Sequence, residues 1–147
     1  MRKAVFAASV VVLAACGPRT ERDLAIKQAT QSYRFEILAD SLPPYANEDI
    51  HYRITVIDRS TNQPVQNGEG QIYAQGSASG RPYTYDGLAY GPEVGVYHAK
   101  LRFAVPAERG MPWQMGLRFH RDSLSPLEVT NWSQQVLPER DNIKPPT

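Results

Sequence analysis

The sequence predicts an all-β fold, an immunoglobulin-like β-sandwich of about seven strands, on three observations. Apolar and polar residues alternate along several short segments, as they do in strands with one buried and one solvent-exposed face. Turn-forming residues separate these segments, and the 147-residue chain contains 12 prolines and 10 glycines. The globular part shows no convincing helical pattern. Short strands divided by turn signals favour a sandwich over a barrel.

The first 15 residues have the layout of a lipoprotein signal peptide and are set aside from the fold. Arg2 and Lys3 precede an apolar run at 4–13 that is too short to span a bilayer. The run ends in Leu13-Ala14-Ala15-Cys16, which resembles a bacterial lipobox, where the signal is cut before an acylated cysteine. We therefore expect acyl chains such as palmitate on Cys16 to hold the protein on a membrane of the cell envelope, facing the periplasm or the exterior. An ordinary signal peptide with an incidental cysteine is the alternative.

The remaining chain divides into a tether, a globule and a tail. Residues 16–31 are polar and charged and are expected to form a lipidated tether, with a short helix at 23–31. The globule is expected over residues 32–137. Its strands are predicted at 32–39, 48–58, 70–75, 81–86 (a weak edge strand), 94–104, 112–120 and 128–137. The polar, proline-rich residues 138–147 are expected to form a disordered tail.

The clearest alternation lies in the two long segments 94–104 and 112–120, which should supply the centre of the core. The only cysteine is Cys16, so no disulfide can join the two sheets. Large aromatic side chains must therefore provide the inter-sheet packing. We expect these to be Phe103, Trp113, Phe119, Trp132 and the inward-facing tyrosines.

Charge and motifs exclude several classes of function. The formal charge of +1 becomes −1 when Arg2 and Lys3 are removed with the signal (1 − 2 = −1), so no strong field points to nucleic acid. The chain contains no G-x-S-x-G, H-E-x-x-H or phosphate-loop motif, and its one cysteine is assigned to the lipid. We therefore expect a protein that is not an enzyme and that binds no nucleic acid.

Two groups of residues resemble those of a known family. Asp58 to Val65 resembles the D-x-x-T-x-x-P-V turn of YtkA-like domains, which are related to the FixH group. The segments 95–99 and 113–115 are similar to that family's G-x-Y-x-A and W-x-(apolar) segments, so the resemblance covers about Tyr33 to His120. The chain departs from the pattern where Asn62 and Gln63 replace a commoner glycine and where Met111-Pro112 interrupts the usual Gly-x-Trp approach. The resemblance implies a secreted, membrane-attached sandwich without a catalytic motif, from a group associated with assembly of respiratory and copper-dependent membrane complexes.

The three histidines are candidate metal ligands. His51, His98 and His120 all fall on the solvent side of their predicted strands. A simple hairpin of the two long strands would place His98 opposite His120, whereas immunoglobulin topology would place 94–104 beside 48–58 and bring His51 towards His98. Two such imidazoles could hold Cu(II) or Zn(II). The alternative is that all three are solvated surface residues.

The methionines Met111 and Met115 have two interpretations. Their thioethers could bind Cu(I), or the side chains could be part of the core. Because they are four residues apart in a strand context, both are expected to point the same way.

Tyr73, Tyr97 and three tyrosines between them lie in this part of the chain, and those on loops could form a sugar- or protein-binding surface. The predicted partner-contacting residues are Arg81, Tyr83, Tyr85 and Tyr90; packing at the edge of a sheet is the alternative.

The expected function is that of a non-catalytic, lipid-anchored envelope protein that binds or supports another envelope protein. Such a protein could be a subunit or assembly factor of a membrane redox complex. A copper-handling metallochaperone and a protein that binds a small ligand or glycan through its tyrosine loops remain as alternatives. No cofactor is expected unless copper binds.

Overall fold

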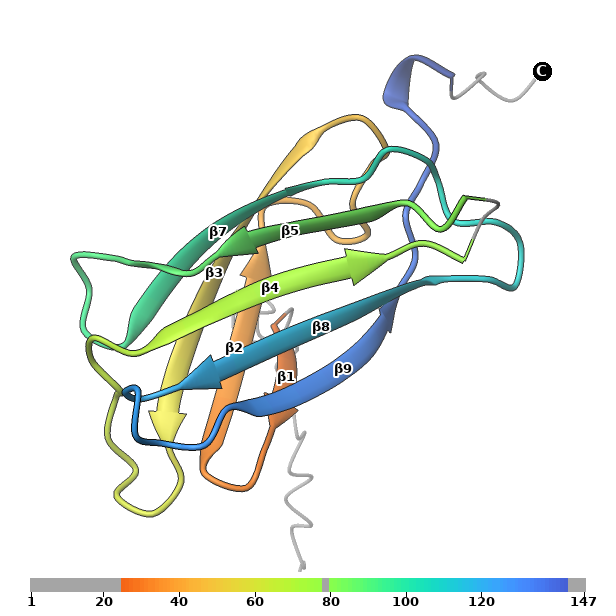
Figure 1. The fold of residues 1–147 in the computed structure, drawn as a ribbon. Helices are drawn as coiled ribbons and strands as arrows, with labels where there is room; N and C mark the ends of the chain where they lie inside the picture. The colour runs from red at the N-terminus through yellow and green to blue at the C-terminus, as the bar shows by residue number, and fades with distance from the viewer. Residues whose placement is uncertain (1–24, 78–79, 143–147) are drawn as a thin grey trace, which may run out of the picture.

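A computed structural model describes residues 25–77 and 80–142, which form a sandwich of two antiparallel sheets (Figure 1). The five-stranded sheet has the order β1-β2-β3-β7-β6, and the four-stranded sheet, in front in Figure 1, has the order β5-β4-β8-β9. The strands are β1 (Ile26–Ala29), β2 (Tyr33–Ala39), β3 (Asp49–Asp58), β4 (Glu69–Gln75), β5 (Tyr83–Gly87), β6 (Ala89–Tyr90), β7 (Val96–Arg102), β8 (Trp113–His120) and β9 (Glu128–Gln134). A 3-10 helix, η2 (Arg140–Asn142), follows them.

The predicted all-β sandwich is confirmed, with nine strands in the described ranges instead of about seven. The two additional strands are β1 and β6, which are only four and two residues long. Strands this short carry too few residues to show a clear alternation in the sequence.

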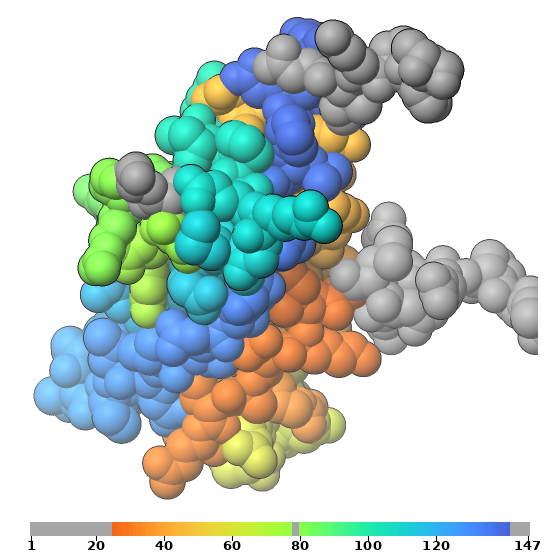
Figure 2. All heavy atoms as spheres, turned by 90° about the vertical axis from the view of Figure 1, so that its right-hand side faces the viewer, coloured from red at the N-terminus to blue at the C-terminus, as the bar shows by residue number. Residues whose placement is uncertain are grey.

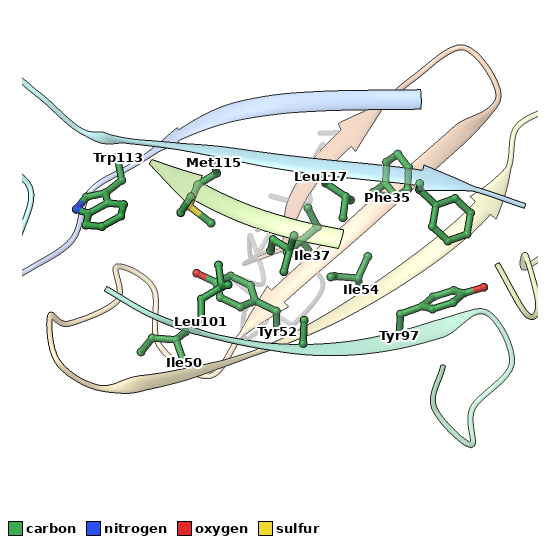
Figure 3. Packing of buried hydrophobic residues seen from close by; sticks show 14 of the residues in the cluster. Phe35, Ile37, Ile50, Tyr52, Ile54, Tyr97, Leu101, Trp113, Met115 and Leu117 are labelled. Carbon is green, nitrogen blue, oxygen red and sulfur yellow. The ribbon is translucent and has the colours of Figure 1, made fainter. Parts of the chain in front are cut away.

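The two long strands β7 and β8 belong to different sheets, so the hairpin alternative is wrong and the immunoglobulin-like arrangement holds. In the register, Leu101 of β7 pairs with Ile50 of β3, and Leu117 of β8 pairs with Ile72 of β4. The chain between β7 and β8 crosses from one sheet to the other. The inward side chains of β3 and β7 therefore meet those of β8 in one apolar layer (Figure 3).

Aromatic side chains dominate that layer, as expected for a core without a disulfide. The rings of Phe103 and Trp113 meet edge to face with centroids 5.1 Å apart, and the Trp113 indole N–H donates to the Val105 carbonyl (3.2 Å). At the other end, Phe119 contacts both Tyr33 and Tyr97 edge to face, at 5.1 and 5.3 Å. Trp132 takes a smaller part than predicted. It is only partly buried against the core, and its indole N–H has no hydrogen-bond partner within the described residues.

Replacing Trp113 by alanine should destabilise the domain by about 3–5 kcal/mol, because it leaves a large cavity between the sheets. Trp113 is only 1% exposed. Urea denaturation followed by circular dichroism measures the loss. Leu124→Ala is the control, since Leu124 is 95% exposed and its removal should change the free energy of unfolding very little. A loss below about 1 kcal/mol for Trp113→Ala would place this side chain outside the core.

Both open edges of the sandwich are closed by side chains that reach from one sheet to the other. On one edge, the Asp86 carboxylate of β5 accepts a hydrogen bond from the Lys100 backbone N–H of β7 (2.8 Å). On the opposite edge, the Glu128 carboxylate accepts from the Ser32 backbone N–H (2.9 Å), and the Thr130 hydroxyl donates to the Gln28 side chain (2.8 Å). Figure 2 shows β9 (blue) lying beside the first strands (orange). These contacts blunt the edges against pairing with other chains.

The turn that follows β3 is organised by the Asp58 carboxylate. One of its oxygens accepts hydrogen bonds from the Ser60 hydroxyl (2.6 Å) and the Ser60 and Thr61 backbone N–H groups (2.8 and 3.1 Å), and the other pairs with Arg121. The hydrogen bonds from Ser60 and Thr61 hold the pKa of the Asp58 carboxyl well below its usual range. Asn62 has a φ of 57°, a left-handed conformation that asparagine tolerates better than most residues other than glycine. The turn therefore forms without the glycine that is commoner at this place in YtkA-like domains.

The pKa of Asp58 leads to a pH-dependent prediction. Its folded value lies below the unfolded value of about 3.9, so the carboxylate stabilises the fold above that pH and loses this contribution as the pH falls. Asp58→Asn should therefore lower the melting temperature at pH 7, and the gap to the wild type should narrow between about pH 5 and pH 2. Thermal melts across this range test it, with the exposed Glu108→Gln as the control for loss of one charge. A gap that is independent of pH would contradict this role for Asp58.

The buried Tyr97 hydroxyl joins β7 to the connection between the two sheets. It donates to the Val65 carbonyl (2.9 Å) and accepts from the Gly68 backbone N–H (2.9 Å). Burial raises the pKa of this phenol. Nearby, Gly95 has a φ of 73°, and a Cβ there would lie 2.4 Å from the Cβ of Pro64. The segments 58–65 and 95–99 therefore pack directly against each other.

Tyr97→Phe should cost about 1–3 kcal/mol, because it leaves the Gly68 N–H and the Val65 carbonyl buried without their partner. Chemical denaturation measures this loss. Tyr85→Phe removes the same atom from a side chain that is 62% exposed and should leave the stability nearly unchanged. Equal effects for the two variants would show that the buried hydroxyl does not stabilise the connection.

The start of the sandwich differs from the expectation. The predicted helix at 23–31 is wrong in its described part, because Ile26–Ala29 is strand β1, paired with β2 from Ile26↔Ile37 to Ala29↔Arg34. An isolated helix of nine residues is marginal, whereas β1 completes a sheet and packs Ile26 against the core. The sandwich thus includes residues assigned to the tether. Cys16 and the predicted signal lie outside the described residues.

The end of the sandwich also differs. Leu137 exchanges backbone hydrogen bonds with the 44–46 segment (both 2.8 Å), and Arg140 pairs with Glu48 (2.8 Å) while its guanidinium lies over the Tyr45 ring (4.4 Å). A disordered tail is therefore wrong for residues 138–142, and 143–147 lie outside the described residues.

Within the described ranges, no helix is long and apolar enough to cross a membrane.

Candidate functional site

The outer face of the five-stranded sheet contains a hollow of about 600 Å³, which we call the histidine hollow. It is lined by Leu38, Ala39, Asp40, Leu42, His51, Tyr52, Arg53 and His98. β2 and the loop after it supply the leucines and Asp40, while β3 and β7 supply the histidines and Arg53. Leu38 pairs with Arg53, and Arg53 pairs with His98, so the hollow follows one row across three strands.

The histidine hollow has an apolar floor and a charged rim. We call the two leucines that line it, Leu38 and Leu42, its floor; Leu38 is half-buried and Leu42 is 37% exposed. At the rim, Arg53 makes a salt bridge with Glu93 (2.5 Å). The Tyr52 ring lies beneath the hollow, where burial and the nearby negative charge of Asp40 raise the pKa of its phenol. Its buried hydroxyl has no hydrogen-bond partner within the described residues. Ionisation of this phenol is therefore suppressed.

Only two of the three predicted histidines share a surface. His51 pairs with Lys100, two residues along β7 from His98, so the two histidines are diagonal neighbours on one face. His120 lies on the other sheet, where its ring nitrogens face the Asp122 carbonyl (2.6 Å) and Glu69 (3.6 Å). Within residues 25–77 and 80–142, no three His, Cys, Asp or Glu side chains gather to hold a metal. The copper alternative therefore has only His51 and His98 on one surface.

The two methionines do not point the same way. Met115 is buried in the core, whereas Met111 is exposed in a turn before β8, bridged to Glu108. The turn breaks the strand alternation on which that expectation rested.

The outer face of the four-stranded sheet carries a second surface, the tyrosine face, formed by Tyr73, Tyr83 and Tyr85. These tyrosines lie on strands β4 and β5, within the strands predicted at 70–75 and 81–86, and not on loops. Their ring centroids are 6.2 Å apart for Tyr73 and Tyr83 and 5.7 Å apart for Tyr83 and Tyr85, with interplanar angles of 31° and 39°. Tyr83 and Tyr85 are 52% and 62% exposed. The three rings therefore form one exposed aromatic strip.

Of the other predicted contact residues, Arg81 lies near the tyrosine face and Tyr90 lies on the other sheet. Arg81 lies beside the strip and lines a polar hollow of about 250 Å³ with Gln75, Gly76, Ser77 and Gln114. Tyr90 lies on β6 of the other sheet, opposite Tyr97, with which its ring makes contact at 5.1 Å. Arg81, Tyr83 and Tyr85 thus share a surface, and Tyr90 does not belong to it.

Sequence reasoning missed several residues of both surfaces. Arg118 and Gln71 flank the tyrosine face, and Leu38 and Leu42 form the floor of the histidine hollow. Alternation along β4 and β8 was a signal for Arg118 and Gln71. Along these strands, outward residues such as Gln71, Tyr73 and Arg118 alternate with residues of the core.

Comparison of the chain with family models, curated proteins and solved structures finds no match.

Proposed function

We propose that the protein is a non-catalytic, lipid-anchored protein of the cell envelope that docks on another envelope protein through the histidine hollow. The observation that carries this proposal is the hollow itself, which combines the apolar side chains of Leu38 and Leu42 with charged and imidazole side chains. An apolar centre with a polar rim is the usual anatomy of a protein interface. The side chains that line the hollow suit docking, and they do not include a nucleophile placed beside a base.

The position of the hollow also suits a membrane-attached partner. β1 begins at Ile26, opposite Ile37, so the chain enters the sheet next to Leu38. Cys16 lies nine residues before Ala25 (25 − 16 = 9), a stretch that spans at most about 30 Å when extended. With acyl chains on Cys16, the hollow is thus held within reach of proteins in the same membrane. The resemblance to YtkA-like domains supports a subunit or assembly factor of a membrane redox complex as the role.

The test places a photoreactive amino acid at position 42 of the full-length chain in its native membrane. We expect cross-links to one membrane protein from position 42 and none from position 124, an equally apolar but distant site on the loop after β8. Leu42→Asp should reduce co-purification of that protein by about tenfold, whereas Leu124→Asp should not. Identical cross-links from both positions, or full co-purification with a folded Leu42→Asp variant, would refute docking at the hollow.

A further inference from the structure

We propose that the tyrosine face is a second binding site, for an acidic polysaccharide whose sugar rings contact the exposed rings of Tyr83 and Tyr85 beside Tyr73. Arg81 and Arg118 would pair with its carboxylates. This surface lies on the opposite sheet from the histidine hollow, so the two sites are independent of each other.

The strip brings three tyrosine rings together on one side of the sheet. Tyr83 and Tyr85 alternate on β5 and so point to one side, and Tyr73 joins them because it pairs with Tyr85 across the sheet. Each neighbouring pair of rings is tilted, by 31° for Tyr73 and Tyr83 and by 39° for Tyr83 and Tyr85. The electron-rich face of an aromatic ring attracts the polarised C–H groups on one side of a pyranose. The spacing of the rings is comparable with the length of one sugar unit, so successive sugars can meet successive tyrosines.

Tyr73 is held in place before any ligand binds. Its ring lies over Gly116, where a Cβ would come within 2.1 Å of the ring. Its hydroxyl meets the Asn131 side chain (3.3 Å), and the Arg118 guanidinium lies 5.3 Å from the ring centroid. Because Gly116, Asn131 and Arg118 hold this ring in place, it loses little conformational entropy when a ligand binds, and this favours affinity.

The surroundings of the strip suit a ligand rich in hydroxyl groups. The other outward residues of β4, β8 and β9 near the tyrosines are amides and a hydroxyl, namely Gln71, Gln75, Gln114, Asn131 and Ser133. Val129 is the one aliphatic side chain that the described strands place on this face, and it lies on β9, across the sheet from the tyrosines. An apolar protein partner would remove water from these amides without replacing their hydrogen bonds, which is unfavourable. Sugar hydroxyls can both donate to the amide oxygens and accept from the amide N–H groups.

The charges beside the strip are complementary to carboxylates. Arg81 lies at one end, beside Gln75 and Gln114, and Arg118 lies beside Tyr73 with its Nε donating to Gln71 (2.9 Å). The acidic residues of the two tyrosine-bearing strands are held elsewhere. Asp86 reaches across the edge to the Lys100 N–H, and Glu69 lies next to His120 at the far end of β4. Arginine binds carboxylates through paired N–H donors, so an acidic sugar chain meets attraction at both ends.

The test uses the full-length chain in detergent micelles and measures binding to polygalacturonate and to neutral dextran by isothermal titration calorimetry. We expect binding to polygalacturonate, weakened by salt, and little binding to dextran. Tyr83→Ala and Tyr85→Ala should each weaken it by about tenfold. Arg81→Gln and Arg118→Gln should also weaken it. Tyr90→Ala, which removes a tyrosine from the other sheet, is the matched control and should leave the affinity unchanged.

Several outcomes would overturn the proposal. These are no binding to polygalacturonate, equal affinity for dextran, or unchanged affinity in both tyrosine variants. Melting curves of each variant show whether it remains folded, and since Tyr83 and Tyr85 are largely exposed, a single substitution should preserve the fold. If one variant did unfold, the other and the arginine variants would still decide the result. Leu42→Asp should bind polygalacturonate as the wild type does, so failure here is distinguishable from failure of docking at the histidine hollow.

Discussion

The two hydrogen bonds of the Tyr97 hydroxyl are the constraint on which the rest of the sandwich depends. Tyr97 is fully buried in the five-stranded sheet, and its partners Val65 and Gly68 belong to the connection that carries the chain into the four-stranded sheet. Its ring also contacts Phe119 of that second sheet. Because the described residues contain no cysteine, this phenol takes the place of a covalent tie between the sheets. Asp58 fixes the start of the same connection, so one turn and one tyrosine set how the sheets face each other.

The way the two sheets face each other also brings their edges together, and this affects which surfaces can bind a partner. Asp86 bonds to the Lys100 N–H on one edge and Glu128 to the Ser32 N–H on the other. Burial acts to raise the pKa of Glu128, but hydrogen bonds from Ser32 and Thr30 outweigh it and lower the pKa, which keeps this carboxylate charged. With both edges occupied, addition of a partner strand is disfavoured. The two outer sheet faces remain open for recognition.

Much of the fold could be predicted because strand alternation is a local property. The buried and exposed sides of β3, β7 and β8 follow from the order of their residues alone. Local order could not decide which strands share a sheet, since both topologies satisfy the same alternation. It also could not find β1, whose four residues are stabilised by pairing with β2, or the ordered residues 138–142, which depend on Glu48 and Tyr45. The sites had the same limit. Alternation places Tyr73 and Arg118 on the outward side of their own strands, but only the register shows that Tyr73 lies beside Tyr85 and next to β8.

The two faces differ in chemistry in a way that suits an anchored protein with two kinds of ligand. The histidine hollow offers Leu38 and Leu42 beside the point where the chain enters the sheet, so a partner docked there would share the membrane with the acyl chains that we propose on Cys16. The tyrosine face offers aromatic rings, amides and arginines on the opposite sheet and so points away from that partner. A two-layer sandwich separates its outer faces by little more than the thickness of two sheets, about 10 Å between their backbones. Binding at both faces would therefore hold a polysaccharide within a short, fixed distance of a membrane protein, a geometry that neither face could provide alone.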